Sequence, residues 1–171
     1  MEVTAEVLRS LMTYDPTAGV FWWRSNPARS TQWNARYAGQ IAGAFDIKGY
    51  QIITICRKAY KAHRLAYLYI HGAWPTGDVD HINGDKADNR IANLREATRS
   101  QNCANKGVGA SNTSGVKGVS WNRSLCKWGA SIKANRRNIH LGYFNDLGEA
   151  QSVYTEAASE YFGQFARAQN K

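Results

Sequence analysis

The spacing of hydrophobic residues in the N-terminal half predicts a small body of alternating helices and strands. Apolar side chains recur at helical spacing over residues 4–12, up to the sequence YDP, and the sequence GVFWWR predicts a strand. Residues 50–56 and 60–62 predict a hairpin that leads into a helix within AHRLAYLYIHG. We expect residues 25–39 to form a loop.

The next segment, VDHINGDKADNRIANLREATRSQNCANK, predicts the order strand, loop, strand, helix. Residues 79–82 and 94–97 are expected to be short strands, and Asn83-Gly84 suits a sharp reversal with positive φ. Residues 98–101 fit a capping box, in which a Thr hydroxyl and a Gln amide each satisfy a free backbone donor. A helix is therefore expected to begin there, with Asn102 in its first turn.

The C-terminal part follows GVGASNTSG, whose composition is typical of a flexible linker. Residues 117–122, 127–133 and 138–144 predict three strands, and residues 146–162 carry apolar side chains at helical spacing. Alternation predicts that one face of the sheet packs on this helix, namely Val119, Trp121, Ala130 and Ile132, together with the aromatic side chains of Trp128, Tyr143 and Phe144. The other face is polar and basic, with Ser120, Asn122, Ser131 and Lys133. The expected fold class is α+β.

Composition and charge indicate a globular protein with a polyanionic partner. The chain has 171 residues, of which 43% are hydrophobic and 12% aromatic, enough for one or two small domains with cores. Its formal net charge is +9. Between residues 97 and 145 there is no Asp or Glu, whereas eight residues are basic: Arg99, Lys106, Lys117, Arg123, Lys127, Lys133, Arg136 and Arg137. A membrane surface would also attract this charge, but the stretch contains no strongly amphipathic basic helix.

The cysteines and the N-terminus predict an intracellular protein. The three cysteines, Cys56, Cys103 and Cys126, are far apart and form no C-x-x-C pair, so neither a disulfide framework nor a zinc knuckle is expected. No apolar run approaches the roughly 18 residues of a membrane span, and the N-terminus lacks the pattern of a secretory signal. We expect a cytoplasmic, intracellular location and no membrane partner.

Asp80-His81, Asn93 and Asn102 form a pattern that suits a nuclease. Asn93 follows His81 by 12 residues and precedes Asn102 by 9. A carboxylate beside an imidazole can place a metal ion next to a general base, and a later amide can supply an oxygen ligand or fix a loop. The alternative for Asp80 and Asn83 is a hairpin turn in which both side chains bond to the backbone.

These residues, with the flanking sequences HINGD, DNRIANLR and QNCANK, resemble the ββα-metal motif of HNH (His-Me finger) endonucleases, in the variant whose third position is Asn. The resemblance implies that Asp80 and Asn102 hold one divalent cation, Mg²⁺ or Mn²⁺. It also implies that His81 deprotonates the attacking water, that Asn93 braces the loop that orients His81, and that products carry 5′-phosphate and 3′-hydroxyl ends. Asn102 stands in place of the final His of the eponymous pattern, which argues against a nitrogen-rich zinc site.

The sequence upstream extends this resemblance over most of residues 1–106. YDP-x-x-G-V-F-x-W, GYQIITI and AHRLAYLYIHGAWP follow the order found in phage HNH proteins. His63 and Arg64 begin the helix in the last of these, where phosphate contact is the alternative to a structural role. The predicted organisation is an HNH endonuclease domain at residues 1–106 with its ββα-metal core at about 78–106, a linker at 107–114 and a second domain at 115–166.

The second domain resembles the ethylene-response-factor (APETALA-two) DNA-binding domain, on KGVSWN, KWGASIK, HLGYF and EAQSVYTEAASEYFG. In that family a three-stranded antiparallel sheet, packed on one helix, enters the major groove. By resemblance the DNA-facing residues are Lys117, Gly118, Ser120, Asn122, Ser131, Lys133, Asn138 and His140. Several family members have Arg or Trp where this chain has Ser120, Asn122, Asn138 and His140. The base preference of the family is therefore not transferred to this chain.

The sequence thus predicts a site-directed DNA endonuclease of the phage homing type. It would hydrolyse phosphodiester bonds of double-stranded DNA, with one divalent cation and a His general base, and act as a monomer. The alternatives are a DNA-binding regulator without catalysis and an RNA-binding or RNA-cleaving protein. Intact Asp80, His81 and Asn102 argue against the regulator, and the paired DNA-binding domain argues against RNA.

Overall fold

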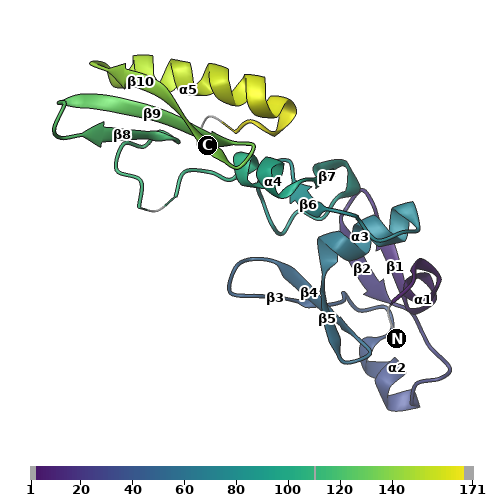
Figure 1. Cartoon of the computed structure of the whole chain (residues 1–171). Helices are drawn as coiled ribbons and strands as arrows, with labels where there is room; N and C mark the ends of the chain where they lie inside the picture. Colours follow the sequence, from purple (N-terminus) through teal and green to yellow (C-terminus); the bar gives the residue numbers. More distant parts are fainter. Residues whose placement is uncertain (1–2, 110, 168–171) are drawn as a thin grey trace. The chain divides into compact units, whose positions relative to one another are not determined.

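The computed structural model describes residues 3–109 and 111–167, and the chain divides into two compact units, Met1–Glu96 and Ala97–Lys171 (Figure 1). This division falls ahead of the helix that closes the predicted nuclease domain. Residues 1–2 of that domain and residue 110 of the predicted linker lie outside the described residues. The domain boundaries at 106 and 115 stay predictions.

The first unit consists of short helices and three small sheets. Its elements are α1 (Ala5–Leu11), β1 (Met12–Asp15), β2 (Val20–Trp23), α2 (Thr31–Tyr37), β3 (Ala44–Phe45), β4 (Gln51–Ile55), β5 (Lys58–Lys61), α3 (Ala62–His71), β6 (Asp78–His81), the 3-10 turn η1 (Ile91–Asn93) and β7 (Leu94–Ala97). β1 pairs with β2, β3 with β4 and β4 with β5, all antiparallel, and β6 pairs with β7. The expected hairpin before α3 and the expected strands on both sides of the Asn83-Gly84 turn are confirmed.

The core of this unit collects one apolar face from each element. Leu8 of α1, Phe21 of β2, Ile53 of β4 and Leu65 of α3 are fully buried within one cluster. Met12 is fully buried too, because β1 follows α1 without a loop. Burial of such side chains is the main favourable term in folding, at roughly 1.5–3 kcal/mol each.

Two expectations for this unit are wrong. The helix predicted up to Met12 ends at Leu11, because Met12 adopts extended backbone angles and pairs with Trp23 of β2. The loop expected over residues 25–39 contains α2, which begins where the Ser30 hydroxyl accepts a hydrogen bond from the Trp33 amide. α2 buries no residue, and its aromatic side chains, Trp33 and Tyr37, make a single i, i+4 pair, which is too short a pattern to indicate a helix.

Glu96 of β7 fastens the loop that precedes β6. Its Oε1 accepts hydrogen bonds from the Thr76 amide and hydroxyl, each at 2.6 Å, and from the Gly77 amide at 2.9 Å. Its Oε2 accepts one from the Tyr67 hydroxyl of α3 at 2.9 Å. These bonds, led by the one from the Thr76 side chain, lower the pKa of Glu96 to about 2. One carboxylate thus ties together α3, the loop and β7.

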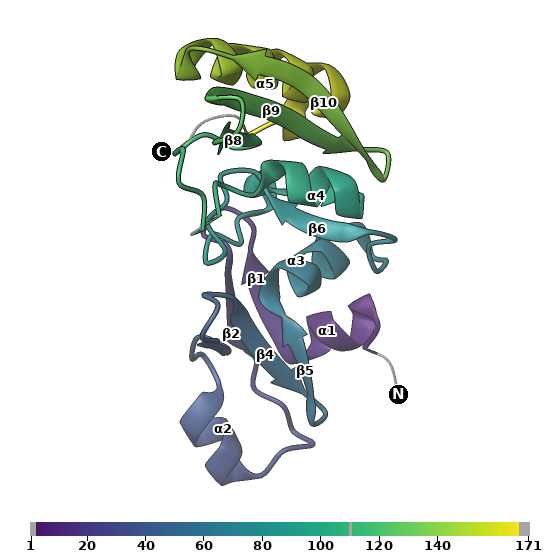
Figure 2. The ribbon, with the colours of Figure 1, turned by 60° about the vertical axis from the view of Figure 1, so that its left-hand side comes forward.

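The second unit is a helix, a three-stranded antiparallel sheet and a longer helix. Its elements are α4 (Arg99–Asn105), β8 (Val119–Asn122), β9 (Lys127–Ala134), β10 (Arg137–Phe144), α5 (Leu147–Phe162) and the 3-10 turn η2 (Gly163–Phe165). The strand order is β10-β9-β8, and α5 lies along one face of the sheet (Figure 2). This confirms the predicted sheet and helix. The expected capping box of α4 is also present, with the Thr98 and Gln101 side chains bonded to each other's backbone amides.

Close packing between sheet and helix requires a glycine at residue 118. Val119, Ala130 and Ile132 pack against Ala150 and other small residues of α5, as predicted. A Cβ at Gly118 would lie 2.1 Å from the Tyr154 ring, and its φ is +70°.

The aromatic side chains divide differently from the prediction. Trp128 and Phe144 are partly buried against the core, as expected, whereas Trp121 and Tyr143 are 44% and 46% exposed. Trp121 packs edge-on against Trp128, its partner in the β8–β9 register, with ring centroids 5.0 Å apart. Alternation decides the face of a residue but not whether the helix reaches it.

Lys117 links α4 to the three-stranded sheet of the second unit. Its ammonium group donates hydrogen bonds to three carbonyls at the end of α4, those of Cys103, Ala104 and Lys106. Burial lowers its pKa, yet the contact is favourable because the C-terminal end of a helix carries partial negative charge. Among the described residues, no helix is long and apolar enough to cross a membrane.

Replacing Glu96 with Gln should flatten the acid dependence of stability. A carboxyl whose pKa is lowered by folding stabilises the fold above its unfolded pKa and loses that contribution as the pH falls through the folded value. The wild type should therefore lose this contribution between pH 4.5 and about 2. Urea unfolding across that range should show a smaller decrease for Glu96→Gln than for the wild type, and parallel curves would contradict the assignment.

Replacing Lys117 with Gln should loosen α4. Loss of a partly buried ammonium at a helix C-terminus costs about 1–2 kcal/mol, which corresponds to roughly 5- to 30-fold faster amide exchange. Hydrogen exchange of the α4 amides measures this directly. Lys127→Gln is the matched control, because this lysine opens β9 on the same sheet and lies outside the α4 cap. Equal exchange in both variants would show that the Lys117 contacts do not hold α4.

Candidate functional site

Strand β6 carries the acidic and imidazole side chains of the site into the interior. Asp80 and His81 are each only 5% exposed. Arg95 of β7 donates from both Nε and Nη2 to Oδ2 of Asp80, each at 3.0 Å. A guanidinium cation thus lies beside this buried carboxylate, and such pairing offsets part of the cost of burying a charged group.

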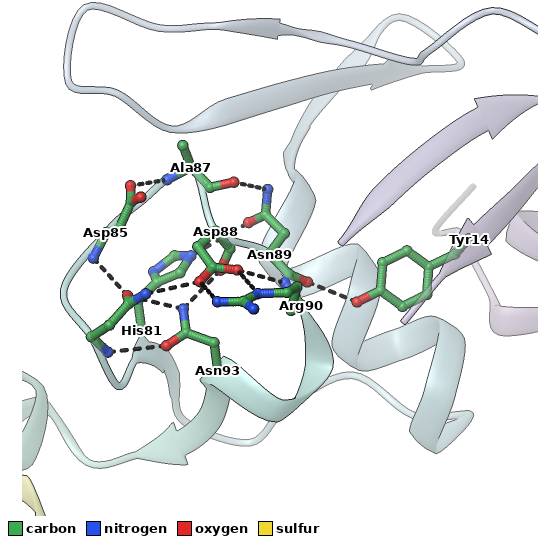
Figure 3. A network of polar contacts seen from close by, with 9 residues as sticks. Tyr14, His81, Asp85, Ala87, Asp88, Asn89, Arg90 and Asn93 are labelled. Atoms are coloured by element: carbon green, nitrogen blue, oxygen red, sulfur yellow. Dashed lines mark hydrogen bonds and ion pairs between the residues drawn. The ribbon is translucent and has the colours of Figure 1, made fainter. Parts of the chain in front are cut away.

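Asn93 ties down the loop that follows His81. Its Oδ1 accepts a hydrogen bond from the Asn83 amide, and its Nδ2 donates to Asn83 Oδ1 and to the Asp88 carbonyl, at 2.9–3.0 Å (Figure 3). The Ile82 amide also donates to the Asn93 carbonyl. These contacts are the ones a loop brace would make. The chain reverses at Gly84 as expected, and the φ of this residue is +75°.

Asp88 and Arg90 complete this loop at the surface. Arg90 donates from Nε and Nη2 to the two oxygens of the Asp88 carboxylate, at 2.8 and 2.6 Å. The Arg90 contacts, aided by a bond from Asn83, lower the pKa of Asp88 to about 2. The loop is thus fixed from inside by one amide and from outside by an ion pair.

Behind His81 lies a chain of buried amides that sequence reasoning missed. Asn89, 1% exposed, places its Oδ1 3.4 Å from Nε2 of His81 (Figure 3). Its Nδ2 donates to Oε1 of Gln51 at 3.0 Å, and Nε2 of Gln51 donates to the Ala42 carbonyl at 2.9 Å. The Asn89 carbonyl accepts a bond from the Tyr14 hydroxyl at 2.7 Å. Asn89 stands in the quoted sequence DNRIANLR, but nothing there links it to Gln51, 38 residues away.

Two aromatic rings flank the His81 imidazole. The His63 ring meets it edge-on with centroids 4.8 Å apart, and the Tyr50 ring lies 6.2 Å away. Burial lowers the pKa of His81, against the opposing effect of Asn89 and of nearby carboxylates, so the ring is neutral at pH 7. Burial first, and the charge of His81 second, lower the pKa of His63 to about 3.

The two residues expected as an alternative phosphate contact have partners within the first unit. His63 is 4% exposed between Tyr50 and His81. Arg64 donates from Nη1 to the Gly77 carbonyl at 3.0 Å and lies over the Trp74 ring. Phosphate contact by this pair stays a prediction.

The expected metal ligands belong to different units. Asp80 lies in β6 of the first unit, and Asn102 lies in α4 of the second. Within the described part of the chain, no three His, Cys, Asp or Glu side chains are grouped so that they could hold a metal ion. The expected pair supplies oxygen donors, a carboxylate and an amide, which suit a hard cation such as Mg²⁺ or Mn²⁺.

The residues expected to face DNA are spread over the sheet of the second unit. Ser120, Lys133, Asn138 and His140 are exposed, and the His140 ring lies 4.5 Å from that of Tyr143. Asn122 and Ser131 are half-buried. Lys117 and Gly118 have structural contacts, with α4 and with Tyr154 respectively.

Comparison with known proteins gives the family. The sequence profile described as HNH endonuclease matches residues 60–104. Protein 3.8 of Escherichia phage T7 is 33% identical over 111 residues, which are 64% of this chain and 91% of the phage protein. The uncharacterized HNH endonuclease L560 of Acanthamoeba polyphaga mimivirus is 38% identical over 106 residues, 61% of this chain and 54% of the mimivirus protein. No solved structure matches.

The matched residues 60–104 include Asp80, His81, Asn93 and Asn102, as well as Asn89 behind the imidazole. The chain therefore belongs to the family of phage T7 protein 3.8 and carries an HNH endonuclease domain at residues 60–104.

Proposed function

We propose that the protein is a metal-dependent endonuclease of double-stranded DNA in which His81 is the general base. The observation that carries the proposal is the buried amide chain aimed at Nε2 of His81, beside the carboxylate of Asp80. A buried Asn and Gln joined in series are costly unless each polar atom is satisfied. The HNH endonuclease match supports the reaction class.

The amide chain supports Nδ1 of His81 as the nitrogen that acts as the base. Nε2 of Gln51 donates to a carbonyl, so its Oε1 must accept, and Nδ2 of Asn89 donates to it. The atom of Asn89 that meets His81 is then Oδ1, an acceptor. Nε2 of His81 therefore bears the proton, and the basic lone pair is on Nδ1.

A neutral imidazole oriented in this way can take a proton from water during attack on phosphorus. Water has a pKa of about 15.7, so its activation by a positioned base contributes roughly 100- to 10,000-fold. Asp80 and Asn102 would hold one Mg²⁺ or Mn²⁺ ion, which when bound neutralises charge on the phosphodiester oxygens. Arg95 orients the Asp80 carboxylate through its hydrogen bond to Oδ2. Products with 5′-phosphate and 3′-hydroxyl ends complete the proposal.

The second unit would bring the nuclease to DNA in a site-directed, homing-type reaction. Support comes from its sheet of three antiparallel strands with exposed Lys133, Asn138 and His140 on strands β9 and β10. The net charge of +9 favours association with a polyanion. Its affinity should fall as salt rises, because bound cations displace counterions from DNA.

Cleavage of supercoiled plasmid tests the proposal. The wild type should give nicked or linear DNA with Mg²⁺ or Mn²⁺ and none with EDTA, and His81→Ala should lose 100-fold or more of the rate, within the roughly 100- to 10,000-fold range of a general base. His71→Ala, at the exposed end of α3, is the matched control and should cut like the wild type. Binding of many DNA substrates without cleavage under any metal would overturn the endonuclease proposal.

Replacement of Asn89 tests the positioning of the base. Asn89→Leu removes the acceptor at Nε2 and should lower kcat by about 10- to 100-fold with little change in KM, since a misplaced group costs about that much. Nitrogen NMR of His81 should show a loss of the Nε2-protonated form. Asn89→Asp keeps an acceptor toward the ring and should recover activity over Asn89→Leu. Equal activity of the two variants would assign Asn89 a purely structural role.

A further inference from the structure

We infer that the second unit binds the DNA backbone in a cavity between α4 and the β9–β10 end of the sheet. The cavity has a volume of about 920 Å³, and α4 lines one side of it with Thr98, Arg99 and Ser100. Lys133, Arg136 and Asn138 line the other side. This inference rests on the proposed function and names the part of the protein that holds the substrate.

The charge of the cavity selects a polyanion. Four cationic side chains line it, those of Arg99, Lys117, Lys133 and Arg136, and no Asp or Glu does. The Lys117 ammonium group donates hydrogen bonds to the carbonyls of α4, so this side chain is part of the cavity wall. The other three come from a helix, a strand and the turn between β9 and β10. Positive charges distributed over three elements suit a row of phosphates better than a single small anion.

Polar and apolar groups complete a surface suited to a nucleotide strand. Ser100 and Ser131 offer hydroxyl groups, and Asn138 offers an amide, all of which commonly bond to phosphate oxygens. Ile132, Tyr154 and Phe162 form an apolar part of the lining. A sugar–phosphate backbone presents both kinds of surface, whereas inorganic phosphate presents only one.

The helix α4 carries both a residue that lines the cavity and a proposed metal ligand. Arg99 precedes Asn102, the proposed metal ligand, by three residues in the same helix. A helix rises about 1.5 Å per residue, so the two lie roughly 4.5 Å apart along its axis. Successive phosphates on one DNA strand are separated by about 3.4 Å along the duplex axis. The cavity residue Arg99 and the proposed metal ligand Asn102 are therefore separated by about one phosphate spacing along the helix.

This placement differs from the DNA-facing surface predicted from the sequence. Lys117, Gly118, Ser131, Lys133 and Asn138 line the cavity, whereas Ser120, Asn122 and His140 do not. Arg99 and Arg136 were not among the predicted contacts. The predicted surface is thus divided into residues that line the cavity and are proposed to bind the DNA backbone, and residues that lie outside the cavity.

The salt dependence of DNA binding tests the inference with a matched pair of variants. Arg136→Gln removes a cavity cation, and Arg137→Gln removes the neighbouring cation, which does not line the cavity. Binding of a short fluorescein-labelled DNA duplex by the full chain is measured in EDTA across a salt series. Each lost phosphate contact lowers the slope of log K against log salt by about 0.9, which amounts to roughly eightfold weaker binding at 0.1 M salt.

We expect this loss for Arg136→Gln and for Lys133→Gln, a combined loss for the double variant, and a much smaller change for Arg137→Gln. Equal effects of Arg136→Gln and Arg137→Gln would overturn the cavity. A loss seen only with single-stranded RNA of the same length would overturn the DNA assignment. Plasmid cleavage by the wild type is scored separately, so an active nuclease with unaltered binding in these variants refutes the cavity alone.

Discussion

The side-chain amide of Asn89 is the contact on which the rest of the site depends. It is buried between Gln51 of β4 and His81 of β6, and its own backbone carbonyl holds the Tyr14 hydroxyl of β1. Only one orientation of the Asn89 amide satisfies both neighbouring side chains, because each donor in this chain of hydrogen bonds requires an acceptor next to it. The small sheets of the first unit therefore act as a frame that fixes one imidazole, and the HNH segment is not independent of the residues before it.

The local elements of the HNH segment were predictable because their signals are local. The strands on either side of Asn83-Gly84 and the capping box at Thr98 depend on neighbouring residues, and both are present. The partners of those residues were not predictable. Gln51 looked like an ordinary strand residue, and the contact of His63 with His81 joins a helix to a strand. Hydrophobic periodicity identifies the buried face of a helix or strand. It does not indicate which polar side chains of different elements contact each other.

The second unit shows the same limit in another form. Alternation correctly placed Val119, Ala130 and Ile132 in the core, but Trp121 and Tyr143 are exposed because coverage by α5 depends on its length and position. The basic stretch between residues 97 and 145 suggested DNA contact without ranking its members. In the structure Lys117 caps α4, whereas Lys133 and Arg136 line a cavity. Equal charges in a sequence thus take different physical roles once their partners are known.

The chemical fate of water in the cleavage reaction tests the central claim most directly. If His81 activates a water molecule for attack on phosphorus, DNA cut by the full chain in ¹⁸O-labelled water should carry one ¹⁸O atom on each new 5′-phosphate, as mass spectrometry of the ends would show. Unlabelled new ends, or label at the 3′ end, would contradict the account, because either result would mean that water does not attack phosphorus with departure of the 3′ oxygen.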